Sequence, residues 1–343
     1  MKKIFFSVLA IAALAACSKS EVQYESPAEI GFAPVKGNIT KATGLEGTLA
    51  TTQELGVWAF WDKDGAPEEP STNGNVTTAI DYRKYSENYL VNALFVNKSG
   101  SNWGAPDDNS YPWPVNGALV FAGYTTPGDV VLTDTAVSYN FADDEMTFTN
   151  YANTNEFDLC WFGRTANSYN NRTNGNPVSV ELSHALTWVT IAVYGEPSVV
   201  DKWKITSMSM NKVAVSGTAV CDGATQKATW SAPTLNTTAL TVGNNNVYPH
   251  TITAGTTTDG KTTGAILADN VLIPSDDVEL TINYSFLVNG VEKTDSKTVT
   301  LNTDMWESGI HYTYTLVFKA NEILVAPSYG DWAEGTNPGI TVE

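Results

Sequence analysis

The sequence predicts an all-β protein built from β-sandwiches. Short runs of alternating apolar and polar residues recur along the chain between clusters of Gly, Asn, Asp and Pro, and helical periodicity is nearly absent. The chain has 343 residues, of which 42% are hydrophobic and 11% aromatic, so it can fill a sizeable core. Because the length favours two domains, we expect two sandwiches in tandem.

The expected strands follow from this alternation. In the segment 279–288, Leu280, Ile282 and Tyr284 share one face, and the Asn289-Gly290 pair after it predicts a tight hairpin turn. A single short helix is expected near residues 151–157. The clearest strand patterns lie at residues 56–61, 119–124, 146–150, 188–194, 204–210, 213–221, 279–288, 298–301 and 311–319.

The division of the chain rests on its most polar linker. Residues 167–177 are dense in Asn and Gly, so we place the domain boundary at or just after them. The expected parts are a signal peptide at 1–16, a pro-segment at 17–41, an N-terminal sandwich at 42–178 and a C-terminal sandwich at 179–343.

Composition excludes several kinds of partner. The chain has 19 Lys and Arg residues against 37 Asp and Glu, and its net charge is −18. Nucleic acids and anionic membrane faces attract clusters of Lys and Arg, so neither is expected as a partner. The charged share of 16% is below the usual quarter or so, and Thr, Asn, Ser and Gly take over the surface. An exported β protein fits this composition.

The N-terminus indicates export. Lys2 and Lys3 precede an apolar run at residues 4–13, which is too short to span a bilayer and is typical of a signal peptide. The sequence Leu14-Ala15-Ala16-Cys17 resembles the bacterial lipobox, which implies acyl chains on Cys17 as the first residue of the mature chain. The alternative is an ordinary secretory signal with an incidental cysteine.

Catalytic, cofactor and metal sites are not expected. Residues 255–262 match the phosphate-loop pattern G-x-x-x-x-G-K-[ST], but too few residues follow before the next strand for the required helix. A Thr-rich hairpin turning at Asp259-Gly260 is the better interpretation. The three histidines, His184, His250 and His311, are far apart in sequence and have no metal-ligand spacing.

The two remaining cysteines and a group of aromatic residues can each be interpreted in two ways. Cys160 and Cys221 are expected to be free and buried, with a disulfide as the alternative. Trp103, Tyr111 and Trp113 lie in a polar, Pro-rich segment where they could form a platform for stacking on sugars. Packing at the rim of the sandwich is the favoured interpretation of these rings.

Several motifs together resemble the fimbrillin family, the type V pilins of Gram-negative anaerobes. They occur in the family's order over nearly the whole chain. The segments are Glu29-Ile30-Gly31-Phe32, residues 55–61, Tyr111-Pro112-Trp113-Pro114 leading into 119–124, 157–166, 182–187, 271–274, 306–314 and Gly330-Asp331-Trp332.

This resemblance implies a fold and a mode of assembly. The fold would be two transthyretin-like Greek-key sandwiches, exported as a lipoprotein. A protease would remove the first strand, marked by Ile30 and Phe32, by cutting between Lys41 and Ala42. The C-terminal strand of another subunit would then fill the groove and build a surface fimbrium with a role in cell adhesion.

Two departures from the family pattern matter. Stalk subunits of the family often carry Arg before the cut, whereas this chain has Lys41, and Lys36 is a second candidate. Anchor subunits stay uncut and lipidated in the outer membrane, so stalk, tip and anchor positions all stay open. The rival hypothesis is a monomeric outer-membrane lipoprotein that binds glycans through exposed aromatic residues, with no cofactor in either case.

Overall fold

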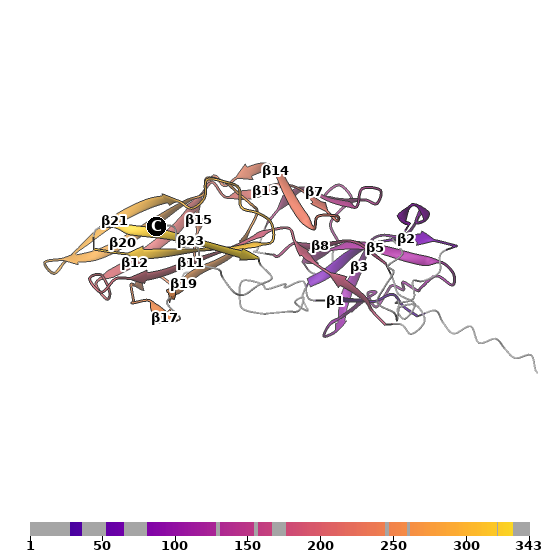
Figure 1. Ribbon diagram of the computed structural model, residues 1–343, viewed down its shortest axis with the longest axis horizontal. Helices are drawn as coiled ribbons and strands as arrows, with labels where there is room; N and C mark the ends of the chain where they lie inside the picture. The colour runs from indigo at the N-terminus through magenta and orange to yellow at the C-terminus, as the bar shows by residue number, and fades with distance from the viewer. Residues whose placement is uncertain are drawn as a thin grey trace, which may run out of the picture.

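The protein is an elongated, nearly all-β molecule in the computed structural model (Figure 1). The structure describes residues 28–35, 53–64, 81–127, 131–153, 157–166, 176–243, 247–258, 261–320 and 322–331. Within these ranges the helical structure is one 3₁₀ turn, Tyr82–Lys84, and no segment forms an apolar helix of membrane-spanning length. The expectation of an all-β sandwich fold is confirmed.

The largest sheet lies at one end of the molecule. It has eight strands in the order β10-β8-β5-β2-β3-β4-β1-β9. The strands are β1 (Phe32–Val35), β2 (Gln53–Asp62), β3 (Glu87–Ser99), β4 (Asn102–Gly104), β5 (Ala118–Pro127), β8 (Cys160–Ala166), β9 (Val178–Glu181) and β10 (Ser183–His184).

Both faces of this sheet are covered, as strand β2 shows. Leu55 and Val57 point into one core, which also contains Phe32, whereas Trp58 and Phe60 point into a second core on the opposite face. Nearly every residue of β2 is therefore buried. A strand covered on both faces has a continuous apolar run in place of strict alternation, which is the pattern of Leu55-Gly56-Val57-Trp58-Ala59-Phe60-Trp61.

The second core is closed by a four-stranded sheet in the order β14-β13-β7-β6. Strands β6 (Val137–Asn140) and β7 (Glu145–Ala152) precede residue 178, whereas β13 (Ala214–Asp222) and β14 (Lys227–Leu235) follow it. Strand β13 pairs with β7, with Cys221 opposite Met146. Strands from both sides of residue 178 therefore share a sheet, and the division of the chain into domains there stays a prediction.

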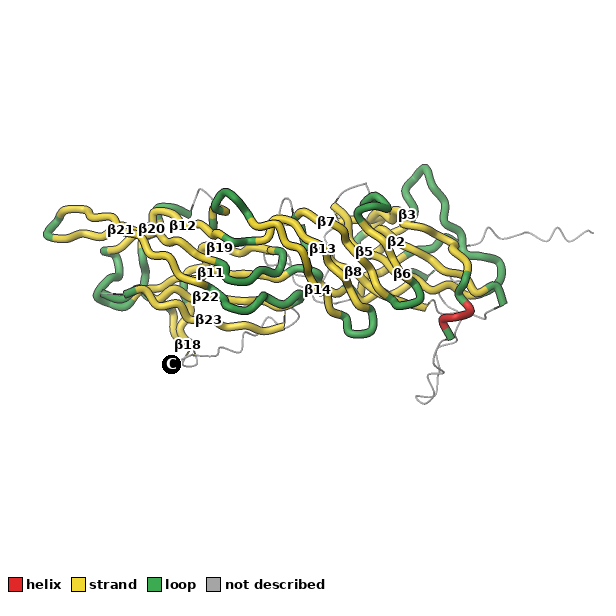
Figure 2. Tube along the Cα trace, turned by 90° about the horizontal axis from the view of Figure 1, so that it is seen from above, coloured by secondary structure: helices red, strands yellow, loops and turns green. Residues whose placement is uncertain are grey.

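The other end of the molecule is a sandwich of two sheets around a third core (Figures 1 and 2). One sheet has the order β19-β11-β22-β23, and the other runs β15-β12-β20-β21 with β16 paired to β12. The strands are β11 (Thr187–Gly195), β12 (Trp203–Asn211), β15 (Leu240–Thr241), β16 (His250–Thr251), β19 (Ala265–Leu272), β20 (Glu279–Val288), β21 (Val291–Thr300), β22 (Ile310–Phe318) and β23 (Ile323–Asp331).

Both predicted hairpins are present. Strands β20 and β21 meet at Val288 and Val291, and Asn289 and Gly290 between them have φ of 50° and 77°, the left-handed values that a type I′ turn requires. Strands β17 (Thr256–Thr258) and β18 (Lys261–Thr263) pair antiparallel, with Thr258 opposite Lys261. Because this segment is a hairpin, it does not form a phosphate loop opening a helix.

The predicted helix at 151–157 is wrong where the structure describes it. Tyr151 and Ala152 extend β7, where they lie opposite Gly217 and Ser216 of β13. Residues 154–156 lie outside the described ranges. Pairing with a strand more than sixty positions along the chain therefore overrides the local preference, as tertiary contacts commonly do.

A half-buried histidine of strand β22 gives a test of stability against pH. The His311 ring lies flat on Trp188 with ring centroids 3.7 Å apart, and burial lowers its pKa from 6.5 to about 4. Between these values the unfolded chain binds a proton that the folded chain does not, so the free energy of unfolding should fall as pH drops from 6.5 towards 4. The variant His311→Phe keeps the stacking, and its free energy of unfolding should fall less between pH 7 and pH 5 than that of the wild-type protein. Urea midpoints at both pH values measure this, and equal losses in both proteins would contradict it.

Candidate functional site: the inserted first strand

The first strand occupies an internal position in the largest sheet. Strand β1 runs parallel to β9, from Phe32 opposite Val178 to Val35 opposite Glu181, and on its other side Phe32 lies opposite Trp103 of β4. Strand β1 therefore lies between β9 and the rest of the sheet. Removing β1 would leave both neighbours with unpaired backbone groups.

Backbone hydrogen bonds hold the residues leading into β1. The amide of Ile30 donates to the carbonyl of Tyr111 at 2.8 Å, and the amide of Trp113 donates to Ala28 at 2.9 Å. On the other side, the Val178 amide donates to the Gly31 carbonyl at 2.7 Å. The segment is therefore fixed on both edges by main-chain contacts, which do not depend on its side chains.

The side chains of Ile30 and Phe32 lie one strand period apart in the core, and both are 0% exposed. The Phe32 ring meets Phe95 and Phe121 edge to face, with centroids 4.8 and 5.1 Å away, and Phe162 at 6.2 Å. These rings form an aromatic cluster around Phe32 in the core. The sequence analysis assigns Ile30 and Phe32 to the first strand, and the structure buries both side chains, with Phe32 in β1 and Ile30 two residues before it.

The start of the segment is polar and lies beside open space. The Glu29 carboxylate accepts hydrogen bonds from the Ser110 hydroxyl at 2.6 Å and the Tyr111 amide at 2.7 Å. A cavity of about 470 Å³ lies alongside, lined in part by Ile30 and Gly31. The inserted segment can therefore be approached from this side.

Three other predicted site residues, Cys17, Lys41 and Ala42, lie outside the described ranges. Their positions in the sequence still relate them to the strand. Lys41 and Ala42 follow the end of β1 at Val35 and precede the start of β2 at Gln53. A cut between them would separate β1 from the rest of the chain.

The aromatic residues suggested for sugar binding do not form a surface platform. Trp103 is 1% exposed and Trp113 is 2% exposed, and both belong to the core around Phe32. The indole nitrogen of Trp103 donates to the carbonyl of Gln53 at 2.8 Å. Tyr111 is half-buried and its ring packs on Phe95 with centroids 4.9 Å apart. The platform suggested for glycan binding is therefore wrong, and the rings pack as favoured, with the two tryptophans in the core and not at the rim.

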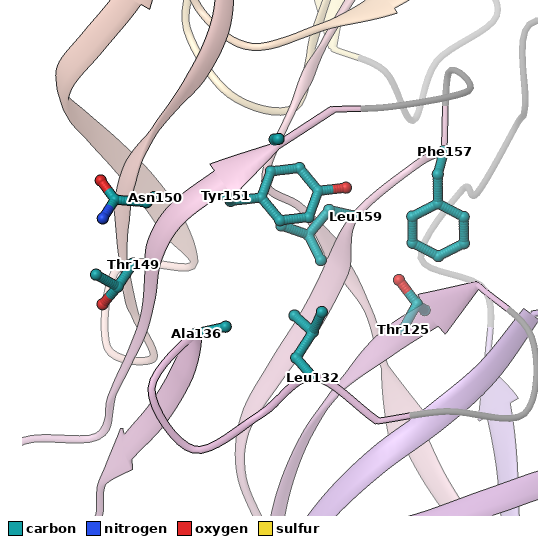
Figure 3. Close-up of a pocket in the computed structure, with 9 residues that line it drawn as sticks. Thr125, Leu132, Ala136, Thr149, Asn150, Tyr151, Phe157 and Leu159 are labelled. Carbon is teal, nitrogen blue, oxygen red and sulfur yellow. The ribbon is translucent and has the colours of Figure 1, made fainter.

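A second cavity, of about 210 Å³, lies between β5 and β7 (Figure 3). Its lining is mainly apolar, with Leu132, Leu159 and Phe157 facing the space beside Tyr151. Burial raises the pKa of Tyr151, so its hydroxyl is protonated at neutral pH. Among the described residues that line this cavity there is no acid, histidine or cysteine.

Sequence reasoning missed one group of residues. The structure brings together Asp158, Cys160 and His184, whose ligand atoms lie within 4.8 Å of one another. Cys160 and Cys221 are both free and buried, as expected. The group escaped notice because His184 lies 24 residues from Cys160 in sequence and is brought to it by the pairing of β10 with β8.

The fold and the site together define a class of protein: an elongated β-sandwich protein whose core is completed by a strand from a separate N-terminal segment. A family model described as fimbrillin-like matches residues 40–332, which is most of the chain. The chain belongs to the fimbrillin-like family, as its sequence motifs predicted. No curated protein matches the sequence.

Solved structures from Bacteroides and Parabacteroides species are similar. A candidate cell adhesion protein from Bacteroides uniformis has a TM-score of 0.52 at 13% identity, covering 90% of this chain and all of its own. A candidate cell adhesion protein from Bacteroides ovatus has 0.47 at 13% identity, covering 89% and 97%. A fimbrial assembly protein from Parabacteroides distasonis has 0.41 at 11% identity, covering 92% and 98%. The first of these similarities supports the fold.

Proposed function

We propose that this chain is a structural subunit of a bacterial surface fimbrium, assembled by strand donation after proteolytic removal of β1. The observation that carries the proposal is the position of β1. It is an internal strand with Phe32 in the core, yet its only connection to β2 along the chain is residues 36–52, which contain Lys41. The membership of the chain in the fimbrillin-like family supports the same conclusion.

Removal of β1 would create a binding site for another strand. The edges of β4 and β9 would lose their partner, and the rings of Phe95, Phe121 and Phe162 would face an empty groove. Each large apolar side chain inserted there contributes about 1.5–3 kcal/mol by burial. An extended segment with apolar residues at every second position would restore both the backbone pairing and the core.

The donor in this proposal is the C-terminal strand of another fimbrial subunit. In this chain the corresponding tail is Gly339-Ile340-Thr341-Val342-Glu343, with apolar residues at alternate positions. Donation from the tail of one subunit to the groove of the next is a head-to-tail contact, which does not close on itself. Repetition of such a contact builds a filament.

Lipid on Cys17 would hold the precursor in the outer membrane, with its sandwiches exposed at the cell surface. Removal of β1 would also remove this anchor, because Cys17 precedes the cut at Lys41-Ala42. Maturation would thus couple release from the lipid to opening of the groove. Its partners would be other fimbrial subunits, with adhesion to host or bacterial surfaces as the role of the assembled fimbrium.

Limited trypsin digestion tests the proposal. The chain from residue 18 onward would be digested briefly, followed by N-terminal sequencing and gel filtration. We expect an early cut before Ala42 and then large oligomers that withstand heating, because a donated strand is held by a full set of backbone hydrogen bonds.

Two results would contradict the proposal in different ways. Protection of the Lys41-Ala42 bond under conditions that cut other sites would contradict removal of β1. A clean monomer after the cut, even with added subunits that carry donor tails, would contradict strand donation. The matched control is a chain that lacks residues 339–343 and is digested in the same way, because it keeps the groove and loses the proposed donor.

A further inference from the structure

Three buried side chains converge on one point between strands β8 and β10. His184 of β10 lies directly opposite Cys160 of β8, and Asp158 precedes Cys160 by two positions, on the same side of the extended chain. Asp158 is 1% exposed, Cys160 is 0% exposed and His184 is 8% exposed. The group plays no part in the proposed fimbrial assembly, although Cys160 belongs to the same core as Phe32 of β1.

Two carboxylate oxygens and one sulfur surround a single nitrogen of the histidine. His184 Nδ1 lies 3.0 Å from Asp158 Oδ2, 3.2 Å from Asp158 Oδ1 and 3.5 Å from Cys160 Sγ. The Cys160 thiol also hydrogen-bonds the Asp158 carboxylate, so the three side chains all contact one another. A cation at the centre of the group would contact every one of these atoms.

The sulfur–nitrogen and nitrogen–oxygen separations are close to those of zinc coordination, and all the ligand atoms lie within 4.8 Å of one another. With Zn–S near 2.3 Å and Zn–N near 2.0–2.1 Å, tetrahedral angles place sulfur and nitrogen about 3.5 Å apart, and nitrogen and oxygen about 3.3 Å apart. The structure has 3.5 Å and 3.0–3.2 Å for these pairs. We propose that Asp158, Cys160 and His184 form a structural site for a divalent transition metal ion, Zn²⁺ in particular, with the carboxylate able to supply both of its oxygens.

The charges and the surrounding hydrogen bonds suit a bound dication. A thiolate on Cys160 and the carboxylate of Asp158 would balance the two positive charges of the metal, so the buried complex would be neutral. Thr125 fixes the backbone beside the ligands: its hydroxyl accepts a hydrogen bond from the Cys160 amide at 2.8 Å and lies 3.2 Å from the Asp158 carbonyl. Binding would release the thiol proton to solvent, and the neutral imidazole would bind the metal through Nδ1 with its one hydrogen on Nε2.

The other cysteine provides a matched control. Cys221 is as buried as Cys160, in strand β13 of the neighbouring core. Among the residues that the structure describes, Asp158, Cys160 and His184 are the one group of three metal-ligating side chains with ligand atoms so close together. Loss of a buried thiol at Cys221 should therefore affect packing without affecting metal content.

Metal content of the full-length chain is the direct test. The chain, with Cys160→Ser, His184→Gln and Cys221→Ser variants, would be produced in zinc-supplemented medium, solubilised in detergent and passed over a chelating resin. Mass spectrometry of the bound metal should give about one zinc ion per chain for the wild-type protein and for Cys221→Ser, and close to none for the other two variants. Production with cobalt should give a thiolate-to-cobalt charge-transfer absorption that Cys160→Ser lacks and Cys221→Ser keeps.

Two outcomes would overturn the proposal. One is a wild-type chain that carries neither zinc nor cobalt, which would leave Asp158 and His184 as a buried hydrogen-bonded pair. The other is equal metal content in the wild-type and Cys160→Ser chains, which would place the metal elsewhere. If Cys160→Ser fails to fold by circular dichroism, the cobalt absorption of the wild-type protein decides by itself, because it reports directly on a thiolate ligand. Neither result depends on whether the chain forms filaments.

Discussion

The Phe32→Ala substitution is expected to lower the free energy of unfolding of the uncut chain by about 3–5 kcal/mol. The ring is 0% exposed and packs against Phe95, Phe121 and Phe162, so truncation leaves a cavity in the middle of an aromatic cluster. In the chain cut at Lys41-Ala42, the same substitution should leave the free energy of unfolding unchanged, because the first strand has then dissociated. Urea unfolding of the uncut and cut forms measures both effects.

Phe148→Ala is the matched control for this prediction. Phe148 is also 0% exposed, but it lies in the core between β7 and the opposite face of the large sheet. Its truncation should destabilise the uncut and cut forms alike, since β7 stays with the protein after the cut. If Phe32→Ala also lowered the stability of the cut form, then β1 would stay bound after proteolysis, and the groove would not be free for another strand.

Replacement of Lys41 by glutamine is expected to prevent both the cut before Ala42 and the assembly that follows it. Trypsin-like proteases require a basic residue before the bond they cleave, and glutamine keeps a polar side chain of similar length without the charge. The Lys41→Gln chain should therefore stay monomeric in gel filtration after a digestion that converts the wild-type chain into oligomers.

Lys36→Gln separates the two candidate sites. Lys36 directly follows Val35, the last residue of β1, and a cut there would release the same strand. We expect Lys36→Gln to be cut and to assemble like the wild-type chain. Assembly of Lys41→Gln together with failure of Lys36→Gln would move the maturation site to Lys36, and assembly of both variants would contradict a lysine-directed cut.

The strands could be predicted from the sequence because their signals are local. Leu280, Ile282 and Tyr284 alternate with polar neighbours, and the pair Asn289-Gly290 supplies the positive φ angles of a tight turn. The sequence also indicates that one face of the inserted strand is buried, because Ile30 and Phe32 are one strand period apart. In each case the information lies within a few residues of the feature.

Features that depend on long-range pairing could not be predicted in this way. Nothing near Tyr151 indicates that β13 will pair with it, and the sequence analysis expected a short helix there. The Asp158, Cys160 and His184 group likewise exists because β10 lies beside β8. Many metal sites can be recognised from the spacing of their ligands within one segment of the chain. The residues of this group come from two separate segments, so no such spacing is present.

The pairing of β13 with β7 has a consequence for how the chain is made and exported. Strand β7 ends at Ala152, whereas β13 begins at Ala214 and its hairpin partner β14 ends at Leu235. A chain emerging from its N-terminus therefore presents Met146 and Phe148 on a strand with one open edge until β13, which ends at Asp222, has appeared. The second core thus closes late, and the length of chain between β7 and the end of β13, divided by the speed of export, sets how long this aggregation-prone edge needs protection.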